Sequence, residues 1–200
     1  MKEAILHLKR SDPVLSGIID RVGEYRIQFR EPGFETLVRS IVNQQLSGRV
    51  ASVIFGRLEA AAGGILTPAA ILKLRPARMR ALGLSAQKTA YIRDLARHTR
   101  DGVVVFEELA HLTDSEIIER LTQVKGVGIW TVHMFLMFAL RRPDVMPVGD
   151  LGIRNAIRKA YNLAELPKPA EIEVMAGRWR PYCSVASWYL WRSLEPNPNL

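Results

Sequence analysis

Cysteine is almost absent from this sequence. The 200 residues include a single cysteine, Cys183, and four histidines that are scattered along the chain. One thiol cannot form an internal disulfide, and it cannot hold an iron–sulfur cluster by itself. The histidines form no dense group of metal ligands. The sequence therefore predicts neither a disulfide framework nor a cluster cofactor.

Long apolar runs are absent as well. No stretch approaches the roughly 20 apolar residues that a membrane-spanning helix needs. The first residues, MKEAILHLKRSDP, place charges on both sides of a short apolar stretch. They lack the long apolar block and the small-residue cleavage site of a signal peptide. These absences predict a cytoplasmic protein with no membrane partner.

Positive charge is what the chain has in excess. Its formal net charge is +8 and its pI is near 10.0, whereas 48% hydrophobic and 24% charged residues are ordinary for a globular protein. A basic balance favours a polyanionic partner, first nucleic acid and second an anionic membrane surface. From composition alone, a basic protein kept in solution by its charge is an equal alternative. A length of 200 residues accommodates one substantial core or two small lobes.

Hydrophobic periodicity predicts a chain that is mostly helical. The segment YRIQFR at 25–30 alternates apolar and polar residues and predicts at most a short extended stretch. Capping signals mark helix starts at Ser85 and at Thr113, where Glu116 completes a capping box. The predicted helices lie at 12–23, from 32 to a break at 47–48, at 49–62, 68–74, 76–82, 86–100, 113–122 and 127–140, from 150, after 169, and at 183–194, with one further turn at 106–110.

The segment VKGVGIWT, residues 124–131, joins two of these helices. The helix 113–122, the turn 123–126 and the helix from 127 predict a helix–hairpin–helix. Gly126 and Gly128 allow a tight turn and leave no side chain between the backbone and a ligand. The start of the second helix favours an anion such as phosphate, and Lys125 adds positive charge beside it. The alternative is a simple glycine turn between two packed helices.

With its flanking segments, this hairpin resembles a known family. The motifs TQVKGVGIWTVHMF and PVGDLGIRNAI, at this spacing, are similar to the helix–hairpin–helix plus Gly/Pro-Asp superfamily of DNA glycosylases, in particular to the bacterial alkylbase enzymes of the 3-methyladenine DNA glycosylase II type. FETLVRSIVNQQLSGRVASVIFGRL and RWRPYCSVASWYLWRSL resemble further parts of the same family, so that the match covers residues 30–195.

The resemblance implies a fold and a domain organisation. The fold is all-α, a two-lobed helix–hairpin–helix DNA glycosylase fold with the active-site cleft between the lobes. The resemblance implies a single domain over residues 1–200, built from two helical sub-lobes. The N-terminal mixed α/β domain of longer family members is expected to be absent.

The resemblance also implies that Asp150 is the catalytic residue. Cleavage of an N-glycosidic bond builds positive charge on the deoxyribose, which a fixed carboxylate stabilises, and the same carboxylate is able to orient or deprotonate a water. Asp150 begins a helix, so it also fits an N-cap, and the two roles are compatible. A helix of about 14 residues rises about 21 Å, and the loop 141–149 spans up to about 30 Å, so Asp150 is able to return to the hairpin.

Trp130 stands where the bifunctional enzymes of the resembled family carry a lysine that forms a Schiff base with the sugar. Tryptophan cannot form one, so the resemblance implies a monofunctional glycosylase that leaves an abasic site. An aromatic face also suits an alkylated purine, because such a base is cationic and a cation–π contact contributes about 0.5–2 kcal/mol. By resemblance, Trp191 lies on the opposite side of the pocket and Met134 lines its floor. Trp188 is expected in the core.

Further roles follow from the resemblance for residues that would touch DNA. The target base must leave the duplex, and the match of the loop NQQLSG places the wedge that fills the gap at Gln45, with Leu46 as the alternative. The hairpin residues that would contact the DNA backbone are Lys125, Gly126, Val127, Gly128 and Thr131. The family also binds a monovalent cation, Na⁺ or K⁺, through hairpin carbonyls that correspond here to Thr122, Val124 and Gly126.

Together these features predict a monomeric, nucleoid-associated enzyme without an organic cofactor, whose partner is double-stranded DNA containing 3-methyladenine or 7-methylguanine. Two alternatives stay open. A non-catalytic helix–hairpin–helix DNA-binding protein would need neither Asp150 nor the pocket aromatics. The other is a glycosylase for another damaged base, such as uracil or hypoxanthine, because Trp130 does not exclude a neutral substrate. On charge alone, Arg39, Arg49 and Lys88 are expected to contact phosphates.

Overall fold

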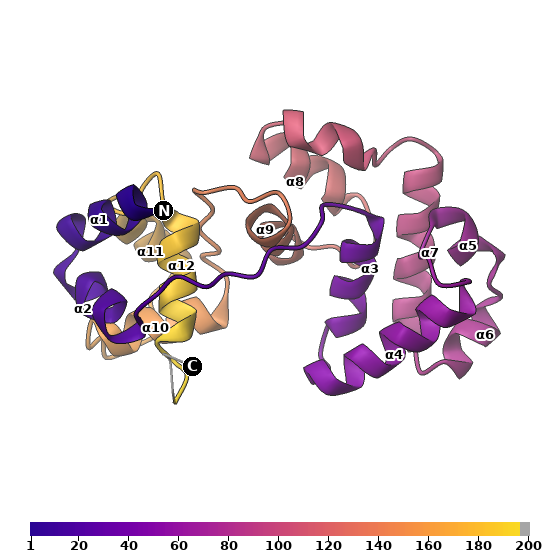
Figure 1. Ribbon diagram of the computed structural model, residues 1–200, viewed down its shortest axis with the longest axis horizontal. Coiled ribbons are helices and arrows are strands. Elements are labelled where there is room, and N and C mark those ends of the chain that lie inside the picture. Colours follow the sequence, from indigo (N-terminus) through magenta and orange to yellow (C-terminus); the bar gives the residue numbers. More distant parts are fainter. Residues whose placement is uncertain (197–200) are drawn as a thin grey trace. The chain divides into compact units, whose positions relative to one another are not determined.

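The computed structural model describes residues 1–196. Every regular element in this part of the chain is a helix, so the all-α prediction is confirmed. The chain divides into two compact units (Figure 1). Unit 1 comprises Met1–Phe29 and the chain from Leu136 onward, and unit 2 comprises Arg30–Phe135. The expected single domain with two helical sub-lobes stays a prediction.

The helices are distributed over both units. Unit 1 contains α1 (Lys2–Ser11), α2 (Pro13–Val22), α10 (Leu151–Ala160), α11 (Pro169–Ala176) and α12 (Cys183–Arg192). Unit 2 contains α3 (Phe34–Asn43), α4 (Gly48–Ala61), α5 (Pro68–Lys73), α6 (Pro76–Ala81), α7 (Ala86–Arg100), the 3₁₀ helix η1 (Phe106–His111) and α8 (Asp114–Thr122). Helix α9 (Ile129–Phe138) contains the boundary between the units.

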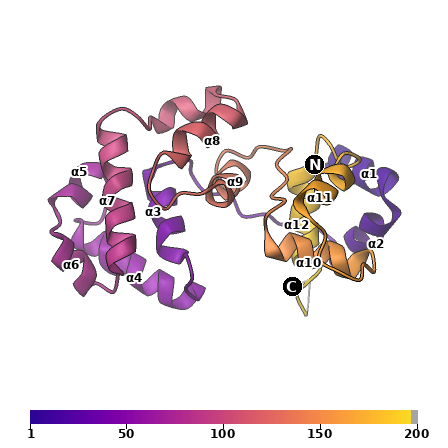
Figure 2. The same cartoon turned by 180° about the vertical axis from the view of Figure 1, so that it is seen from behind.

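Helix α12 forms the centre of unit 1. All its residues from Cys183 to Leu190 are buried, and the helix packs against α1, α2 and α10 (Figure 2). A helix surrounded on every side must be apolar or internally satisfied around its whole circumference. Tyr25 packs edge-on against Trp188, with ring centroids 4.8 Å apart. The expectation that Trp188 belongs to the core is confirmed.

A buried carboxylate joins the N-terminal helices to this core. Asp12 is 1% exposed and caps α2 by accepting hydrogen bonds from the Val14 and Leu15 N–H groups. Its second oxygen accepts from the Tyr161 hydroxyl and from Trp179 Nε1. Burial and the hydrogen bond to Asp12 raise the pKa of Tyr161 far above its ordinary value. Four donors therefore compensate for the loss of hydration that burying a charge entails.

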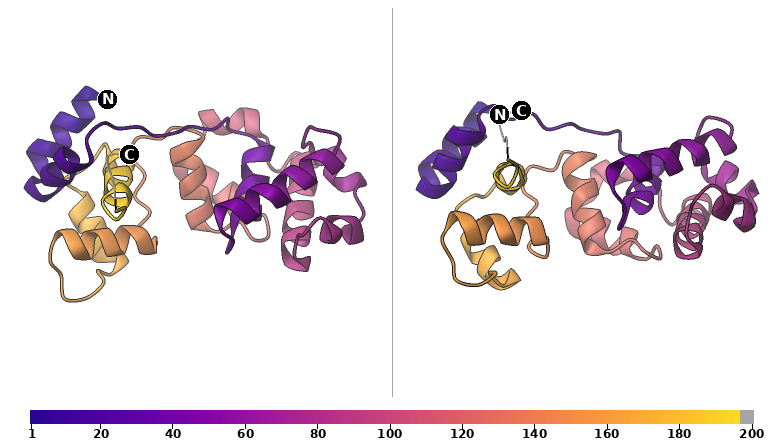
Figure 3. Two further views of the ribbon diagram at one scale, coloured as in Figure 1. Left: turned by 60° about the horizontal axis from the view of Figure 1, so that its bottom comes forward. Right: turned by 90° about the horizontal axis from the view of Figure 1, so that it is seen from below.

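Helix α7 is the scaffold of unit 2, where it packs against α3, α5 and α6 (Figures 1 and 3). Ser85 caps its first turn as predicted, with Oγ accepting from the Lys88 N–H at 3.1 Å. Arg93 Nη1 donates to the Leu74 carbonyl at 2.6 Å, just beyond α5. The buried side of α7 includes Ile92 and Leu95, both fully covered.

The helix predictions agree with the structure except at ends and at the N-terminus. The helix predicted over 86–100 is Ala86–Arg100, whereas the one predicted over 127–140 is shorter, Ile129–Phe138. The segment 25–30 forms no strand. Helix α1 was not predicted, because its apolar stretch is short and its buried face consists of only Ala4 and Leu8. No helix in residues 1–196 is long and apolar enough to cross a membrane.

Candidate functional site

Asp150 lies directly before α10, in extended backbone with φ −71° and ψ 124°. Its Oδ1 accepts a hydrogen bond from the Ile153 N–H at 2.8 Å, so the predicted N-cap is confirmed. The same oxygen accepts a hydrogen bond from Trp191 Nε1 at 2.8 Å. Two donors on one oxygen hold the carboxylate in a single orientation, although the residue is only partly buried. The bond to Trp191 is not predictable from the sequence pattern around Asp150.

Gly152 makes room for this pair. A Cβ atom at position 152 would lie 2.9 Å from Asp150 Oδ1 and 3.0 Å from Trp191 Cδ1. These separations are shorter than van der Waals contacts, so any side chain here would displace the carboxylate or the indole. Gly152 is therefore a supporting residue that sequence reasoning missed. Its only signal in the sequence was its place two residues after Asp150.

Trp191 is held from two sides. Its ring stacks on Phe138, with centroids 6.0 Å apart and an angle of 27° between the planes. Its N–H edge points to Asp150. Aromatic stacking and a hydrogen bond to a carboxylate together leave the indole little freedom. The role of Trp191 as one side of a base pocket stays a prediction.

The loop that precedes Asp150 is fastened to the first turn of α12. The Ser184 hydroxyl donates to the Arg142 carbonyl at 2.6 Å and accepts from the Val145 N–H at 3.0 Å. The Ser184 N–H donates to the Pro143 carbonyl at 2.9 Å. One residue thus satisfies three backbone groups of the loop. Helix α12 holds the loop with its first turn and Asp150 with its last.

Asp144 strengthens the same attachment. Its Oδ2 accepts a hydrogen bond from Arg180 Nη1 at 2.8 Å, and its Oδ1 accepts from the Cys183 N–H at 3.3 Å. Burial raises the pKa of Asp144, but the hydrogen bonds from Cys183 and Arg180 outweigh burial and hold that pKa below its ordinary value. The carboxylate therefore stabilises the start of α12 in its charged form.

In unit 2, the hairpin at 123–128 follows α8. This helix begins with the predicted capping box of Thr113 and Glu116. Gly126 has a φ of +80°, in the left-handed region that favours glycine. A Cβ atom on Gly126 would lie 2.0 Å from the ring of Tyr91. The missing side chain of Gly126 therefore makes room for a protein ring, which corrects the expectation that both glycines clear space for a ligand. Of the two hairpin glycines, Gly128 is the one at which a Cβ atom would face open space.

The other hairpin residues differ in exposure. Lys125 is exposed, whereas Val127 and Thr131 are buried. The Lys125 N–H donates to Asp94 Oδ2 at 2.9 Å, so this backbone group already has a protein partner. A DNA contact at Lys125 would use its ammonium group, and one at Val127 or Thr131 would use the backbone. The assignment of these residues to the DNA backbone stays a prediction.

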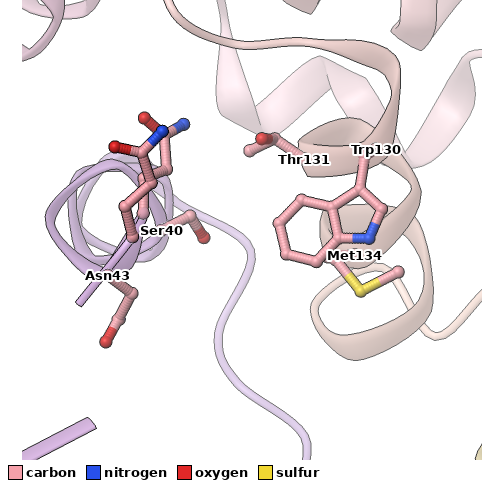
Figure 4. Close-up of a pocket in the computed structure, with 7 residues that line it drawn as sticks. Ser40, Asn43, Trp130, Thr131 and Met134 are labelled. Carbon is pink, nitrogen blue, oxygen red and sulfur yellow. The ribbon is translucent and has the colours of Figure 1, made fainter. Parts of the chain in front are cut away.

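A pocket of about 430 Å³ lies within unit 2, between α3 and the first turns of α9. Figure 4 shows Ser40 and Asn43 on α3, which lies opposite the helix that carries Trp130, Thr131 and Met134. Trp130 is 49% exposed, which is unusual for the largest apolar side chain. The volume suits a small ligand. The residues that line the pocket are Ser40, Asn43, Gln44, Gln45, Trp130, Thr131 and Met134.

The two wedge candidates occupy different surroundings. Gln45 lines the pocket and has a φ of 57°, in the left-handed region. Leu46 is 38% exposed and does not line the pocket. Both residues are exposed; Gln45 lines the pocket with Trp130 and Met134, and Leu46 lies on the same turn outside the pocket lining. Which of the two residues enters DNA stays a prediction.

Lys88 has hydrogen-bond partners within unit 2. Its ammonium group donates to the Val42 carbonyl at 2.7 Å and to the Gln44 carbonyl at 2.6 Å. Burial lowers the pKa of Lys88. Two of the three donors of this ammonium group are therefore committed to protein carbonyls, and the expected phosphate contact of Lys88 stays a prediction. Arg39 is also engaged, because its guanidinium lies 3.7 Å from the centroid of the Phe55 ring.

Two of the three carbonyls expected to bind a cation already accept hydrogen bonds. The Gly126 carbonyl accepts from Gln44 Nε2 at 2.9 Å, and the Val124 carbonyl accepts from the Val127 N–H at 3.1 Å. These partners reduce the capacity of the set that includes Thr122, and the cation site stays a prediction. Within residues 1–196, no three His, Cys, Asp or Glu side chains are grouped to hold a metal ion.

The candidate residues therefore form two groups. Asp150 and Trp191 are joined in unit 1, and Trp130, Met134 and Gln45 line one pocket in unit 2. The expected cleft that would unite Asp150 with Trp130 stays a prediction.

Comparison with known families decides what kind of protein carries these two groups. The family model of HhH-GPD superfamily base excision DNA repair proteins matches residues 38–181, which include the hairpin, Trp130 and Asp150. The chain belongs to the HhH-GPD superfamily. The family predicted from the two glycine-containing motifs is thereby confirmed.

Two relatives of this HhH-GPD protein are similar to it in length and fold. DNA-3-methyladenine glycosylase 1 of Schizosaccharomyces pombe is 36% identical over 200 residues, which cover 96% of this chain and 87% of the relative. A solved structure of the 3-methyladenine DNA glycosylase of S. pombe in complex with abasic DNA has a TM-score of 0.86, with 36% identity and 98% of each chain covered. A DNA-3-methyladenine glycosidase from Bacillus halodurans has a TM-score of 0.87, with 36% identity and coverage of 95% and 88%.

Proposed function

We propose that this HhH-GPD protein is a monofunctional DNA glycosylase that hydrolyses the N-glycosidic bond of alkylated purines, such as 3-methyladenine and 7-methylguanine, in double-stranded DNA. The observation that carries the proposal is the Asp150 carboxylate, oriented by Ile153 and Trp191. The relatives' names, DNA-3-methyladenine glycosylase and glycosidase, support the substrate class. The complex of one relative with abasic DNA supports the product.

Asp150 supplies the negative charge that the reaction needs. As the bond between C1′ and the purine nitrogen breaks, the base takes the electron pair and positive charge develops on the sugar. A carboxylate held in place stabilises this charge without reorganising at the moment of reaction. Water then adds to C1′ and loses a proton, so that the products are the free base and an abasic sugar. Asp150 is also able to accept a hydrogen bond from that water.

Trp130 suits the leaving group. Its half-exposed indole offers a π face to a base extruded from the duplex, and Met134 lies one turn further along α9. Alkylated purines are cationic, so stacking adds a cation–π contribution. A charged base departs readily, so a strong general acid is unnecessary. Because position 130 is tryptophan rather than lysine, the protein has no Schiff-base nucleophile there, and the product is an abasic site in an unbroken strand.

DNA engagement follows from the hairpin and the positive charge. Lys125 and the exposed backbone at Gly128 are suited to a phosphate next to the start of α9. The net charge of +8 supports non-specific attraction to duplex DNA. A monomer bound to the nucleoid is sufficient for this activity. The non-catalytic alternative is less favoured, because it gives no reason for the fitted arrangement of Asp150, Gly152 and Trp191.

The proposal is tested by release of bases from DNA treated with a methylating agent, resolved by chromatography, for wild type and Asp150→Asn. The asparagine keeps an oxygen that caps α10 and accepts from Trp191, so folding and DNA binding should persist. We expect wild type to release 3-methyladenine or 7-methylguanine and the variant to be slower by about 100- to 1000-fold. Duplexes that contain hypoxanthine or uracil test the alternative lesions. Binding of abasic DNA without release of any of these bases would refute the enzyme assignment.

A further inference from the structure

Gln44 connects two segments that lie far apart in the sequence. Its side-chain Nε2 donates to the Gly126 carbonyl of the hairpin at 2.9 Å, across 82 positions of sequence. Its own backbone carbonyl accepts from Lys88 Nζ at 2.6 Å. One residue therefore joins the turn 44–47 to the hairpin 123–128 and also to α7. All these residues belong to unit 2.

Helix α7 supports both segments from one face. Lys88, Tyr91 and Asp94 are spaced three residues apart, so they follow one side of the helix. Lys88 binds the turn, and the ring of Tyr91 fills the space beside Gly126. Asp94 accepts from the Lys125 N–H of the hairpin at 2.9 Å. The turn and the hairpin therefore rest on a single rigid element.

Lys88 contacts two carbonyl acceptors at once. Its ammonium group is shared by the Val42 and Gln44 carbonyls at the C-terminal end of α3, where the helix dipole favours a cation. The adjacent Gln45 has a φ of 57°. A non-glycine residue keeps such a conformation only where its surroundings hold it. The contacts of Lys88 and Gln44 on the preceding residues provide that constraint.

We propose that Gln44 and Lys88 are positioning residues that hold the turn carrying Gln45 and Leu46 in fixed register with the hairpin. This inference rests on the proposed function. Extruding a base from the duplex is unfavourable. A side chain inserted from this turn offsets that free energy while the hairpin binds the DNA backbone. If the turn moves away from the hairpin, its side chain inserts less well. Because Gln44 and Lys88 hold the turn to the hairpin and to α7, binding of the DNA backbone and insertion of the side chain are coupled.

The experiment uses the full chain and a duplex in which 2-aminopurine stands next to a stable abasic-site analogue. Fluorescence of 2-aminopurine rises on unstacking, so it reports insertion without requiring catalysis. Gln44→Met keeps the length of the side chain but removes its donor, and Lys88→Met removes the cation. Lys88→Arg keeps charge and donors. Gln28→Met, at an exposed position in unit 1, is the matched control for the glutamine substitution.

We expect Gln44→Met and Lys88→Met to bind the duplex with nearly the affinity of wild type but to give a smaller fluorescence rise. Their single-turnover excision of alkylated bases should fall about tenfold in duplex DNA, the effect of one lost hydrogen bond. In single-stranded DNA, where no stacked base must be displaced, the loss should be much smaller. Lys88→Arg should recover most of the rate, and Gln28→Met should match wild type. The double variant should lose less than the product of the two single losses, because both act on one turn.

Several results would overturn the inference. One is a fluorescence rise in Gln44→Met equal to that of wild type, and another is an equal loss of excision in duplex and single-stranded DNA. If Gln44→Met does not fold, Gln44→Glu takes its place, because the carboxylate has the same shape and cannot donate to Gly126. Failure of the proposed function gives a different pattern: wild type unstacks 2-aminopurine but releases no alkylated base. In that case the fluorescence comparison still decides the role of Gln44.

Discussion

Trp191 donates its indole hydrogen to the oxygen of Asp150 that also caps α10, at 2.8 Å. The carboxylate orientation is therefore set jointly by a helix start and by a side chain 41 positions away. Phe138 supports the indole from behind, and Gly152 leaves the space between the two groups open. The catalytic proposal depends on this fit, so small changes around it should affect the rate more than DNA binding.

Gly152→Ala should be a severe catalytic variant. The added methyl group would lie 2.9 Å from Asp150 Oδ1, so the carboxylate or the indole must shift. A displacement of about 1 Å at a reacting group costs about 100-fold in rate. We expect single-turnover excision to fall by about that factor while the affinity for abasic DNA is unchanged. A rate equal to wild type would show that the Asp150–Trp191 contact does not matter for catalysis.

Trp191→Phe should have a milder effect of the same kind. It keeps an aromatic ring beside Phe138 but removes the N–H donor. A hydrogen bond to a charged group contributes about 1.5–3 kcal/mol, so we expect excision to slow by about 10- to 100-fold. The combination with Gly152→Ala should add little, because both changes release the same carboxylate. Additive losses would mean that the two residues act separately.

Trp130 should discriminate between charged and neutral bases. Trp130→Ala removes the π face, and Trp130→Phe keeps a smaller one. We expect Trp130→Ala to slow the release of cationic 7-methylguanine more than that of neutral hypoxanthine, by an extra factor of about 3–30 that corresponds to the cation–π contribution. Trp130→Phe should recover part of the difference. Equal losses for both bases would assign Trp130 to packing alone.

Leu46 should be the inserted wedge. Both Leu46 and Gln45 are exposed, but Leu46 is apolar and lies outside the pocket that Gln45 lines. We expect Leu46→Ala to reduce excision from duplex DNA strongly and from single-stranded DNA only slightly, because an apolar wedge offsets lost stacking. Gln45→Gly is the matched comparison, since glycine accepts a φ of 57° without strain. If Gln45→Gly shows the duplex-specific loss and Leu46→Ala does not, the roles are reversed.

Asp144 should make stability depend on acidic pH. Its folded-state pKa lies below the ordinary value of 3.8, so its contribution is fully present above that value and is lost as pH falls through the folded pKa. In Asp144→Asn the side chain cannot ionise. We therefore expect the free energy of unfolding, measured in urea, to differ between wild type and variant by a constant amount at pH 5–7. The difference should become smaller below about pH 4.

The matched control for Asp144 is Glu173→Gln, because Glu173 pairs with the same arginine, Arg180, but is exposed. Exposed ion pairs contribute little to stability, so this variant should unfold close to wild type at every pH. If the difference in the free energy of unfolding between wild type and Asp144→Asn does not change with pH, Asp144 acts by packing rather than by charge. The same variants also test whether the loop before Asp150 loses its attachment.

Much of the local structure was predictable because its causes are local. Ser85, Thr113 and Asp150 begin helices through hydrogen bonds to residues three positions ahead, and these signals are visible in the sequence. Gly126 was recognised as a turn residue for the same reason. The sequence predicted that the turn needs a glycine here. It did not predict that the Tyr91 ring occupies the space of the missing side chain, because this ring comes from another helix.

The sequence by itself determined the helical class, the helix starts, the superfamily and the identity of Asp150 and Trp130 as candidates, because periodicity, capping and short motifs act over a few residues. Only the tertiary structure decided which polar groups pair. Lys88 binds the turn, Gln44 reaches the hairpin across 82 positions, and Trp191 reaches Asp150 across 41. Such partners are chosen by the packing of whole helices, since a buried or strained group takes whichever donor or acceptor the fold brings within reach.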